Sequence, residues 1–535
     1  MAHLRLMFLS CLLVLASVAG AVAGGATQPT PDRPDSARPA FASVVANPLA
    51  ENDRGEYVTL SVSEGTNLSA YTLDDGEERL RLPSVNATGT VVLTAHPNAV
   101  RQVGNRHVVS VSLPQLSNSG ERLRLRRGEE TVATLSYEDA PEGEVYIEGA
   151  WRPVGATDYP VVHGERGEAR GFVLPDAPGA ALRPIKRAEE RVLLAGYTFT
   201  SRRVTDALIR AHERGATVRV LLEGGPVGGI TSAQAGRLDR LTTAGIDVRV
   251  VDGPAARYRY HHAKYVVTDG NATVLTENWK PSGVGGTSSR GWGVTLSDRS
   301  VVTSLSATFT GDFNYQAATE WQQFREGVKF VSEMPVSGSF PSQTAPATVS
   351  YENVSLLIAP DNAETEVLRR IERAEESVRV VQMSVGNVDQ SFVTATVDAA
   401  RRGVEVRLLL SGAWYVEEAN RRVAKRLNRL AEQEEIPLAV RLARPRGYGK
   451  IHAKGVVVDE TVVLGSMNWN DNSARENREV LLALSGPEVA SYYRDVFDRD
   501  WRASGGRGER PVGLIVVLGG LAGCCLLAAR RLQFE

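Results

Sequence analysis

Two short stretches decide how this 535-residue chain is organised: "YHHAKYVVTDG", Tyr260 to Gly270, and "KIHAKGVVVDE", Lys450 to Glu460. Each places a lysine two residues after a histidine, and an aspartate five residues after that lysine. The chain holds only seven lysines against 54 arginines, so lysine is rarely used where positive charge alone is needed. Two of the seven in one pattern indicate a repeated functional motif.

The motif belongs to a longer internal repeat. "AHERGATVRVLLEGG", residues 211–225, recurs as "AARRGVEVRLLLSGA", residues 399–413, at an offset of 188. Asp312 recurs as Asp500 at the same offset, and the histidine motifs recur at an offset of 190. A near-constant offset over roughly 100 residues indicates an internal duplication.

Each copy alternates strand and helix patterns. In the first copy, residues 191–199 read as a buried strand, residues 202–215 as an amphipathic helix closed by Gly215, and residues 217–225 as the next strand. This β-α-β order predicts an α/β sandwich with mostly parallel strands. Gly215 and its counterpart Gly403 are expected only to end helices.

The repeated motif predicts a cluster of polar side chains. On a strand, alternation places His262 and Lys264 on one face and Ala263 on the other. Asn278 and "GSMNW", residues 465–469, come near the end of the next strand in each copy. Polar residues are therefore expected at matching strand ends in both copies.

Two imidazoles in a site poor in carboxylates suit phosphoryl transfer without a metal. One neutral histidine can attack phosphorus, and a second, protonated histidine can give its proton to the leaving oxygen. Two lysines and two asparagines would hold the non-bridging oxygens. Lysine is a compact point charge, which explains its use here in place of arginine. No metal or other cofactor is expected.

The His-x-Lys-x-x-x-x-Asp pattern, present twice and followed in the second copy by Gly-Ser-x-Asn, resembles the phospholipase D superfamily over roughly residues 175 to 505. The resemblance implies a duplicated α/β/α sandwich of two pseudo-twofold-related halves, residues 175–335 and 350–505, with one active site between them. The residues that it implies are catalytic His262, Lys264, Asp269, His452, Lys454 and Asp459, and phosphate-binding Asn278, Ser466 and Asn468.

The same resemblance suggests individual roles. In most members the N-terminal histidine attacks, which favours His262 as nucleophile and His452 as acid, although the sequence alone does not order them. Asp269 and Asp459 are expected to support the fold more than the reaction. A glutamate after the asparagine often orients a histidine, which suits Glu479.

The first half departs from the family pattern. Thr276 stands where the second half has Ser466, and it keeps a hydroxyl. The segment "SRGWGV", residues 289–294, has no glutamate at the place of Glu479. This loss of symmetry leaves the role of each histidine open.

Two loops and one further histidine precede the motifs. "RYRY", residues 257–260, and "ARPRGYGK", residues 443–450, combine basic and aromatic residues. Such loops either contact phosphate or bases, or are solvated. His261 is expected to point to the opposite face from His262 and to be structural.

Residues 41–151 show short alternating segments split by turn signals, which predicts a small all-β sandwich. The segments "ANPLAENDRGEYVTL" (46–60), "LSAYTLDDG" (68–76) and "LSNSGERLRLRRGEETVATLSY" (116–137) resemble the lamin-tail domain, an immunoglobulin-like sandwich. That resemblance implies an accessory or binding module without catalytic residues.

The two ends of the chain indicate a location. Residues 1–23 read as a secretory signal peptide, with an uncleaved membrane anchor as the alternative, and residues 24–40 as a flexible linker. Residues 511–529 are uncharged and long enough for a transmembrane helix, and two arginines follow them. The three cysteines, Cys11, Cys524 and Cys525, all fall in these ends. The body is therefore expected outside the cell, tethered to the cell membrane by one C-terminal helix, without a disulfide or a thiolate metal site.

The sequence thus predicts a metal-independent phosphodiesterase that acts through a covalent phosphohistidine. Phospholipid headgroup release or phosphatidyl transfer is favoured by the tether, although no apolar interfacial loop is obvious. An extracellular nuclease is the alternative, favoured by the basic-aromatic loops and the lamin-tail-like module and disfavoured by a net charge of −2. A non-catalytic surface binding protein is a second alternative. Water or alcohol as the acceptor, and the oligomeric state, stay open.

Overall fold

The computed structural model describes residues 38–100, 106–332, 336–444 and 446–505. The signal peptide predicted at 1–23, the transmembrane helix predicted at 511–529 and most of the predicted linker lie outside these residues. Among the helices that are described, none is both long and apolar enough to span a bilayer.

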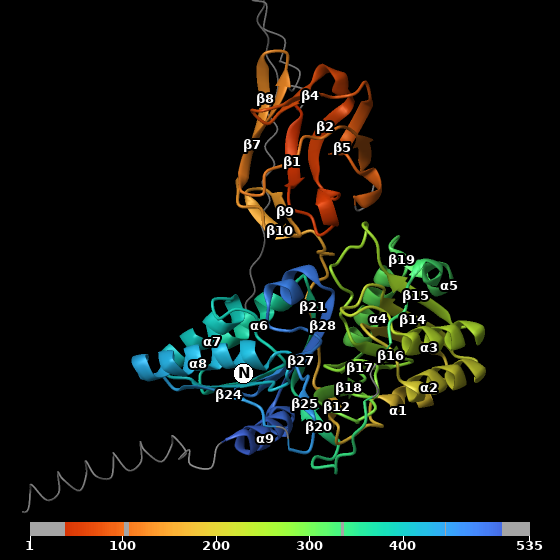
Figure 1. Ribbon diagram of the computed structural model, residues 1–535, viewed down its shortest axis with the longest axis vertical. Helices are drawn as coiled ribbons and strands as arrows, with labels where there is room; N and C mark the ends of the chain where they lie inside the picture. Colours follow the sequence, from red (N-terminus) through yellow and green to blue (C-terminus); the bar gives the residue numbers. More distant parts are fainter. Residues whose placement is uncertain (1–37, 101–105, 333–335, 445, 506–535) are drawn as a thin grey trace, which may run out of the picture.

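The N-terminal part of the described chain is a two-layer β region, drawn red to orange in Figure 1. One sheet has the strand order β10-β9-β1-β2-β5-β6 and the other the order β4-β3-β7-β8. Buried residues such as Leu60, Leu93 and Leu123 form the core between them. The strands are β1 (Ala40–Val45), β2 (Tyr57–Asn67), β3 (Thr72–Asp74), β4 (Arg79–Arg81), β5 (Asn86–Thr94), β6 (His107–Ser110), β7 (Gly120–Arg127), β8 (Glu130–Glu138), β9 (Glu144–Ile147) and β10 (Ala150–Pro153). The N-terminal β region predicted from the sequence is confirmed, and its likeness to a lamin tail stays a prediction.

The first α/β half follows a short linker. Its elements are β11 (Val162–Gly164), β12 (Gly167–Leu174), α1 (Leu182–Arg187), β13 (Arg191–Gly196), α2 (Arg202–Glu213), β14 (Thr217–Glu223), α3 (Ser232–Thr243), β15 (Asp247–Val251), β16 (Tyr265–Thr268), β17 (Asn271–Leu275), β18 (Ser289–Leu296), α4 (Arg299–Phe313), β19 (Ala318–Glu320), α5 (Trp321–Phe324) and β20 (Ala347–Tyr351). Strands β11 and β12 precede residue 175, and β11 pairs with β21 of the second half.

The second half repeats this series. Its elements are β21 (Asn353–Ala359), α6 (Ala363–Glu372), β22 (Ser377–Gln382), α7 (Ser391–Arg401), β23 (Glu405–Leu410), α8 (Glu417–Glu434), β24 (Leu438–Leu442), β25 (Lys450–Ile451), β26 (Gly455–Val458), β27 (Thr461–Gly465), β28 (Glu479–Ser485) and α9 (Pro487–Ser504). The order β24-β23-β22-β26-β27-β28-β21 matches β15-β14-β13-β16-β17-β18-β12 strand for strand.

The sheets are mixed, which corrects the expectation of mostly parallel strands. Strands β13, β14 and β15 are parallel because a helix crosses over between each pair. Strands β16, β17 and β18 follow one another without an intervening helix and run antiparallel. The sequence pattern identified the helical crossovers but not the antiparallel connections.

Local sequence explains where the helices of the repeat begin and end. The Ser201 side chain accepts a hydrogen bond from the backbone N–H of Val204 and caps α2. Gly215 and Gly403, which follow the ends of α2 and α7, have φ of 102° and 96°. Glycine adopts this backbone conformation without a steric penalty, so these two residues end the helices as expected.

The two halves share one hydrophobic core. It joins Trp292 and Val294 of β18 to Leu464 and Leu482 of β27 and β28. Helix α9 contacts β27 and β28 of its own half and β12 and β20 of the other, and α4 contacts both β16 and β21. Helices α1 to α3 and α6 to α8 cover the two outer faces, as Figure 1 shows.

Candidate active site

Each histidine motif lies just before an inner strand of its sheet. Tyr265, the first residue of β16, pairs with Ala195 near the C-terminal end of β13. In the second half Gly455 of β26 pairs with Val381 near the end of β22. Both motifs therefore lie at the sheet edge where the parallel strands end, in the segments that precede β16 and β26 and not on the strands that the sequence pattern predicted for them.

The backbone of each motif is held by the other half. The N–H of His262 donates to the carbonyl of Arg478 at 3.0 Å, and the N–H of His452 donates to the carbonyl of Arg290 at 2.9 Å. Arg290 and Arg478 occupy equivalent positions at an offset of 188: Arg290 is the second residue of β18, and Arg478 directly precedes β28. The two motifs are therefore placed at the junction of the halves.

His262 is oriented by a carboxylate from the second half. Its Nδ1 lies 2.8 Å and 3.0 Å from the two carboxylate oxygens of Glu479, which is fully buried at the start of β28. Because a carboxylate accepts, Nδ1 carries the hydrogen and the lone pair is on Nε2. Burial lowers the pKa of His262 to about 4, although Glu479 opposes this effect, so the ring is neutral near pH 7.

His452 faces a carboxylate that the sequence analysis did not identify. Its Nδ1 lies 3.3 Å from Oε2 of Glu277, whose side chain is 3% exposed. Oε1 of Glu277 is buried and has no hydrogen-bond partner among the described residues. Burial lowers the pKa of His452 to about 4; Lys454 adds to this effect and Glu277 opposes it. Each histidine thus lies beside a buried glutamate of the other half.

The two motif lysines are buried and lie close enough to affect each other. The Nζ of Lys264 donates to the carbonyl of His262 at 2.5 Å, and the Nζ of Lys454 donates to the carbonyl of His452 at 2.8 Å. Burial lowers the pKa of Lys454 to about 8 and that of Lys264 well below its usual range, and the Lys454 charge lowers that of Lys264 further. An anion between the two lysines would stabilise their charged forms.

The two asparagines also present unsatisfied polar atoms. Asn278 and Asn468 are half-buried and follow the ends of β17 and β27. Their Oδ1 atoms are buried and have no hydrogen-bond partner among the described residues. Each asparagine therefore has a side-chain oxygen that the described residues leave without a donor.

The hydroxyls of Thr276 and Ser466 are engaged within the sheet. Oγ1 of Thr276 accepts from the N–H of Trp292, and Oγ of Ser466 accepts from the N–H of Val480, each at 3.0 Å. Both side chains are fully buried. They join the strands that carry the polar residues, and the structure does not leave them free for phosphate.

The structure does not bring Asp269 and Asp459 to the histidines. They follow the far ends of β16 and β26, and each accepts three backbone N–H groups, from residues 189–191 and 375–377. Burial alone would raise the pKa of Asp269, but these N–H groups lower it. Both aspartates hold the start of the neighbouring strand, which is the supporting role that was expected of them from the sequence.

The "RYRY" loop is neither free nor simply solvated. Tyr258 is buried and donates to Asp312 at 3.1 Å. Arg259 pairs with Glu142 of the β-sandwich at 2.6 Å and with Glu476 of the second half. His261 is fully buried 3.5 Å from Asp312, which agrees with a structural histidine. The loop therefore contacts the β-sandwich, the first half and the second half at once.

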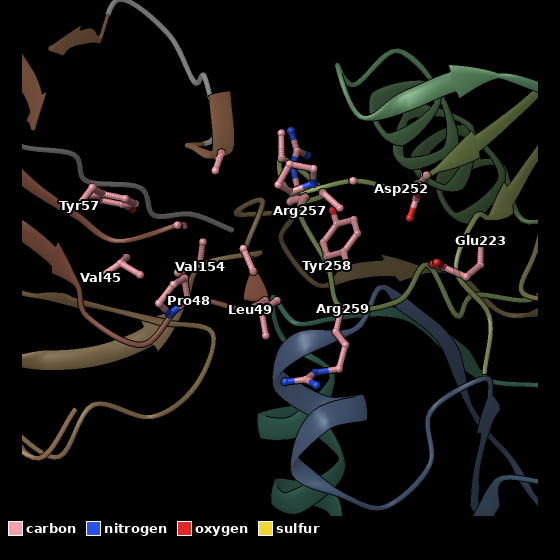
Figure 2. Close-up of a pocket in the computed structure, with 18 residues that line it drawn as sticks. Val45, Pro48, Leu49, Tyr57, Val154, Glu223, Asp252, Arg257, Tyr258 and Arg259 are labelled. Atoms are coloured by element: carbon pink, nitrogen blue, oxygen red, sulfur yellow. The ribbon is translucent and has the colours of Figure 1, made fainter. Parts of the chain in front are cut away.

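A cavity of about 180 Å³ lies between the β-sandwich and the first half (Figure 2). Val45, Leu49 and Tyr57 line it from the sandwich, and Tyr258 and Arg259 line it from the first half. Neither motif histidine lines it. The cavity is therefore lined by the "RYRY" loop and the β-sandwich, and it is separate from the site between the halves.

The site combines two neutral imidazoles, two buried lysines and two buried glutamates. It can provide a nucleophile, a proton donor and cationic groups for an anion. Within the described part of the chain, no group of three or more His, Cys, Asp or Glu side chains has the geometry to hold a metal ion.

Comparison with known proteins points to one family. Residues 182–313 and 367–501 match the family model described as "Cardiolipin synthase, PLD-like domain". Phospholipase D of Rickettsia prowazekii (strain Madrid E) is 28% identical over 154 residues, which is 28% of this chain and 69% of that protein. Mitochondrial cardiolipin hydrolase of Xenopus tropicalis is 29% identical over 143 residues, 26% of this chain and 62% of that protein.

A solved structure gives the same fold over both halves. The chain is similar to the crystal structure of phosphatidylserine synthase from Haemophilus influenzae Rd KW20, with a TM-score of 0.50 and 13% identity. The match covers 69% of this chain and 96% of that one. At this identity the likeness describes the fold alone.

Proposed function

Because residues 182–313 and 367–501 carry a PLD-like domain, we propose that the chain is a phosphodiesterase with one active site between its two halves. The observation that carries the proposal is the pairing of each buried histidine with a buried glutamate of the other half, His262 with Glu479 and His452 with Glu277. Two core histidines of a decayed repeat would not need this arrangement.

The first step forms a phosphohistidine. Nε2 of His262 attacks phosphorus while the bond from phosphorus to the leaving oxygen breaks, and Nε2–H of His452 gives its proton to that oxygen. Glu479 holds the ring of His262 so that its lone pair points away from the carboxylate. His452 must be protonated at this point, and the negative phosphodiester beside it raises its pKa above the value of the empty site.

The second step breaks the phosphohistidine and restores the free enzyme. Water or an alcohol gives its proton to Nε2 of His452 as its oxygen attacks phosphorus, and the bond between phosphorus and His262 breaks. Lys264, Lys454 and the two asparagine amides balance the charge on the non-bridging oxygens in both steps. No further reactant is needed for atoms and protons to balance.

We favour a phospholipid as the substrate. Trp414 is 84% exposed and Tyr415 is 43% exposed, in the loop that follows β23 at the same sheet edge as the site. The Nζ of Lys450, two residues before His452, lies 5.2 Å from the Tyr415 ring centroid. Aromatic rings beside a cation suit the boundary between lipid headgroups and acyl chains. The names of the two relatives above also concern phospholipids.

The location remains part of the proposal. A signal peptide at 1–23 and a membrane helix at 511–529 would place the body outside the cell and keep the site near lipid headgroups. The β-sandwich would then be an accessory module beside the membrane.

A nuclease is the second candidate, because an exposed tryptophan and a nearby lysine also suit stacked bases and phosphate. The "RYRY" loop, residues 257–260, does not support a nuclease. Tyr258 is buried and bonded to Asp312, and Arg259 is paired with Glu142 and Glu476, so both side chains are already engaged within the protein. A net charge of −2 gives no general attraction to it either.

The test is a paired assay on the purified full-length protein in the presence of EDTA. Phospholipid vesicles labelled in the headgroup and labelled DNA are offered separately to the wild type, to His262→Ala and to His107→Ala, a control in the β-sandwich. Headgroup release that only His262→Ala loses supports the lipid enzyme. DNA cleavage with the same dependence supports the nuclease, and activity on neither substrate contradicts the proposal.

A further inference from the structure

The glutamate that faces His452 does not come from the position expected by symmetry. In the first half Leu275 pairs with Gly293, and in the second half Gly465 pairs with Leu481. Counting back two residues along β18 and β28 makes Gly291 the counterpart of Glu479. The first half therefore has no side chain where the second half has its histidine-orienting carboxylate.

Glu277 in turn occupies a position that is apolar in the other half. At the offset of 190 that relates the histidines, its counterpart is Met467. Met467 is 1% exposed and packs in the hydrophobic core of the second half. The first half thus has a carboxylate at 277 where the second half has a core methionine, and a glycine at 291 where the second half has a carboxylate.

The two replacements fit each other sterically. A Cβ added to Gly291 would overlap Cγ of Glu277 and lie 2.6 Å from its Oε1. The Glu277 side chain therefore fills the space that a side chain at 291 would need. Either Glu277 or a glutamate at 291 can occupy this space, but not both.

We propose that Glu277 and Gly291 are a paired substitution that moves the carboxylate partner of His452 from β18 to the segment that follows β17. Glu277 is then the positioning residue for His452, as Glu479 is for His262. Its role in proton transfer rests on the proposed function, whereas its pairing with His452 does not.

The exchange also makes the two histidines different. Both oxygens of Glu479 lie within 3.0 Å of Nδ1 of His262, whereas Glu277 approaches His452 with one oxygen at 3.3 Å. The firmer contact suits a nucleophile whose lone pair must be aimed. The looser contact suits a ring that gives up and takes back a proton.

The test transplants the arrangement of the second half into the first. Glu277→Met removes the carboxylate, Gly291→Glu adds one at the symmetric position, and the double variant copies the Met467 and Glu479 pair. We expect Glu277→Met to lower kcat by about 100-fold and Gly291→Glu to be destabilised by overlap. The double variant should recover kcat to within about tenfold of the wild type.

A second readout does not depend on turnover. The full-length protein contains eight histidines, so 15N-labelled histidine gives few signals, and His452→Asn identifies that of His452. Glu277→Gln, which keeps the shape but not the charge, should lower the pKa of His452 by about 1 and leave that of His262 in place. The double variant Glu277→Met/Gly291→Glu should bring the pKa of His452 back to its wild-type value. Glu366→Gln on α6 is the control and should leave that pKa unchanged.

The outcomes separate the two proposals. If the His452 signal responds as expected while neither vesicles nor DNA are cleaved, the carboxylate exchange stands and the proposed function fails. If Glu277→Gln leaves the His452 signal unchanged, or if the double variant folds without restoring it, the exchange is overturned. A double variant that does not fold leaves Glu277→Gln as the deciding measurement.

Discussion

Arg478 and Asp312 form an ion pair between the two halves, with Nε of the arginine 2.9 Å from Oδ2 of the aspartate and both side chains buried. Its counterpart, at an offset of 188 for both residues, joins Arg290 to Asp500 at 2.9 Å. The carbonyl groups of these arginines hold the two histidine motifs. The duplicated ion pairs thus fix the halves together at the site itself.

Removing Arg478 should destabilise the protein strongly. In Arg478→Ala, Asp312 and Asp361 lose a buried charge partner, and we expect the free energy of unfolding to fall by about 3–5 kcal/mol. The control is Arg422→Ala, because Arg422 pairs with Glu418 on an exposed helix face and should change stability by less than about 1 kcal/mol. Urea unfolding measures the free energy of unfolding of both variants. Equal decreases in the two would argue against the buried ion pair as the contact that holds the halves together.

Asp269 should matter for stability and not for chemistry. Its carboxylate accepts three backbone N–H groups at the start of β13, so Asp269→Ala should cost about 1–3 kcal/mol. Its φ of 40° suits asparagine, so Asp269→Asn should keep kcat within a few fold of the wild type. Thermal unfolding and steady-state kinetics on the same samples separate the effects. A large loss of kcat in a stable Asp269→Asn protein would restore a catalytic role.

The duplicated α/β organisation and both histidine motifs were predictable because they are local patterns repeated at a near-constant offset. Arg290 and Arg478 recur at the offset of 188 but were missed, because a single arginine pair does not stand out in a chain with 54 arginines. The swapped contacts between halves could not be read from the sequence, since each joins residues roughly 200 positions apart.

Glu277 was missed for a different reason. The segment "SRGWGV" has no glutamate at the place of Glu479, and the strand register makes Gly291 the equivalent residue. The carboxylate that faces His452 is fourteen residues earlier, just past the end of β17, and only the register of β17 against β18 brings the two positions together. Because the carboxylates of the two halves come from different repeat positions, a comparison of matching positions does not reveal Glu277.

Stability should fall as the pH drops below neutrality. In the folded protein burial lowers the pKa of His262 to about 4, whereas the unfolded chain takes up this proton near pH 6.5. The unfolded state therefore binds more protons between pH 6.5 and 4, and stability decreases over this window, by an amount on the order of 3 kcal/mol for one such histidine.

His262→Asn should weaken this pH dependence. The measurement is the difference in melting temperature between pH 7 and pH 4.5 for the wild type and the variant. Other buried groups, such as Glu223, titrate in both proteins and largely cancel in this comparison. An unchanged pH dependence in His262→Asn would contradict a neutral buried imidazole at this position.

The order of the two histidines can be tested with leaving groups of different basicity. If His452 is the acid, His452→Ala should lose about 10²–10⁴-fold with an alkyl ester but much less with a nitrophenyl ester, whose leaving oxygen needs no proton. His262→Ala should lose activity on both. After quenching in base, where the P–N bond survives, a phosphohistidine should be detected only in proteins that keep His262. The reverse pattern would assign the nucleophile to His452.

The exposed pair Trp414 and Tyr415 gives the sharpest distinction between a lipid interface and the reaction itself. Replacing both with serine should weaken sedimentation with phospholipid vesicles and lower headgroup release from them by at least about tenfold, because the rings no longer enter the interface. Cleavage of a short-chain phospholipid below its critical micelle concentration should stay within about twofold, since the ring contacts of this pair in the described chain are with each other and with Lys450. The control is Val336→Ser, which removes another exposed apolar side chain. Equal losses on vesicles and on the monomeric substrate would place the aromatic pair in substrate binding, and no loss on vesicles would remove the main structural support for a lipid substrate.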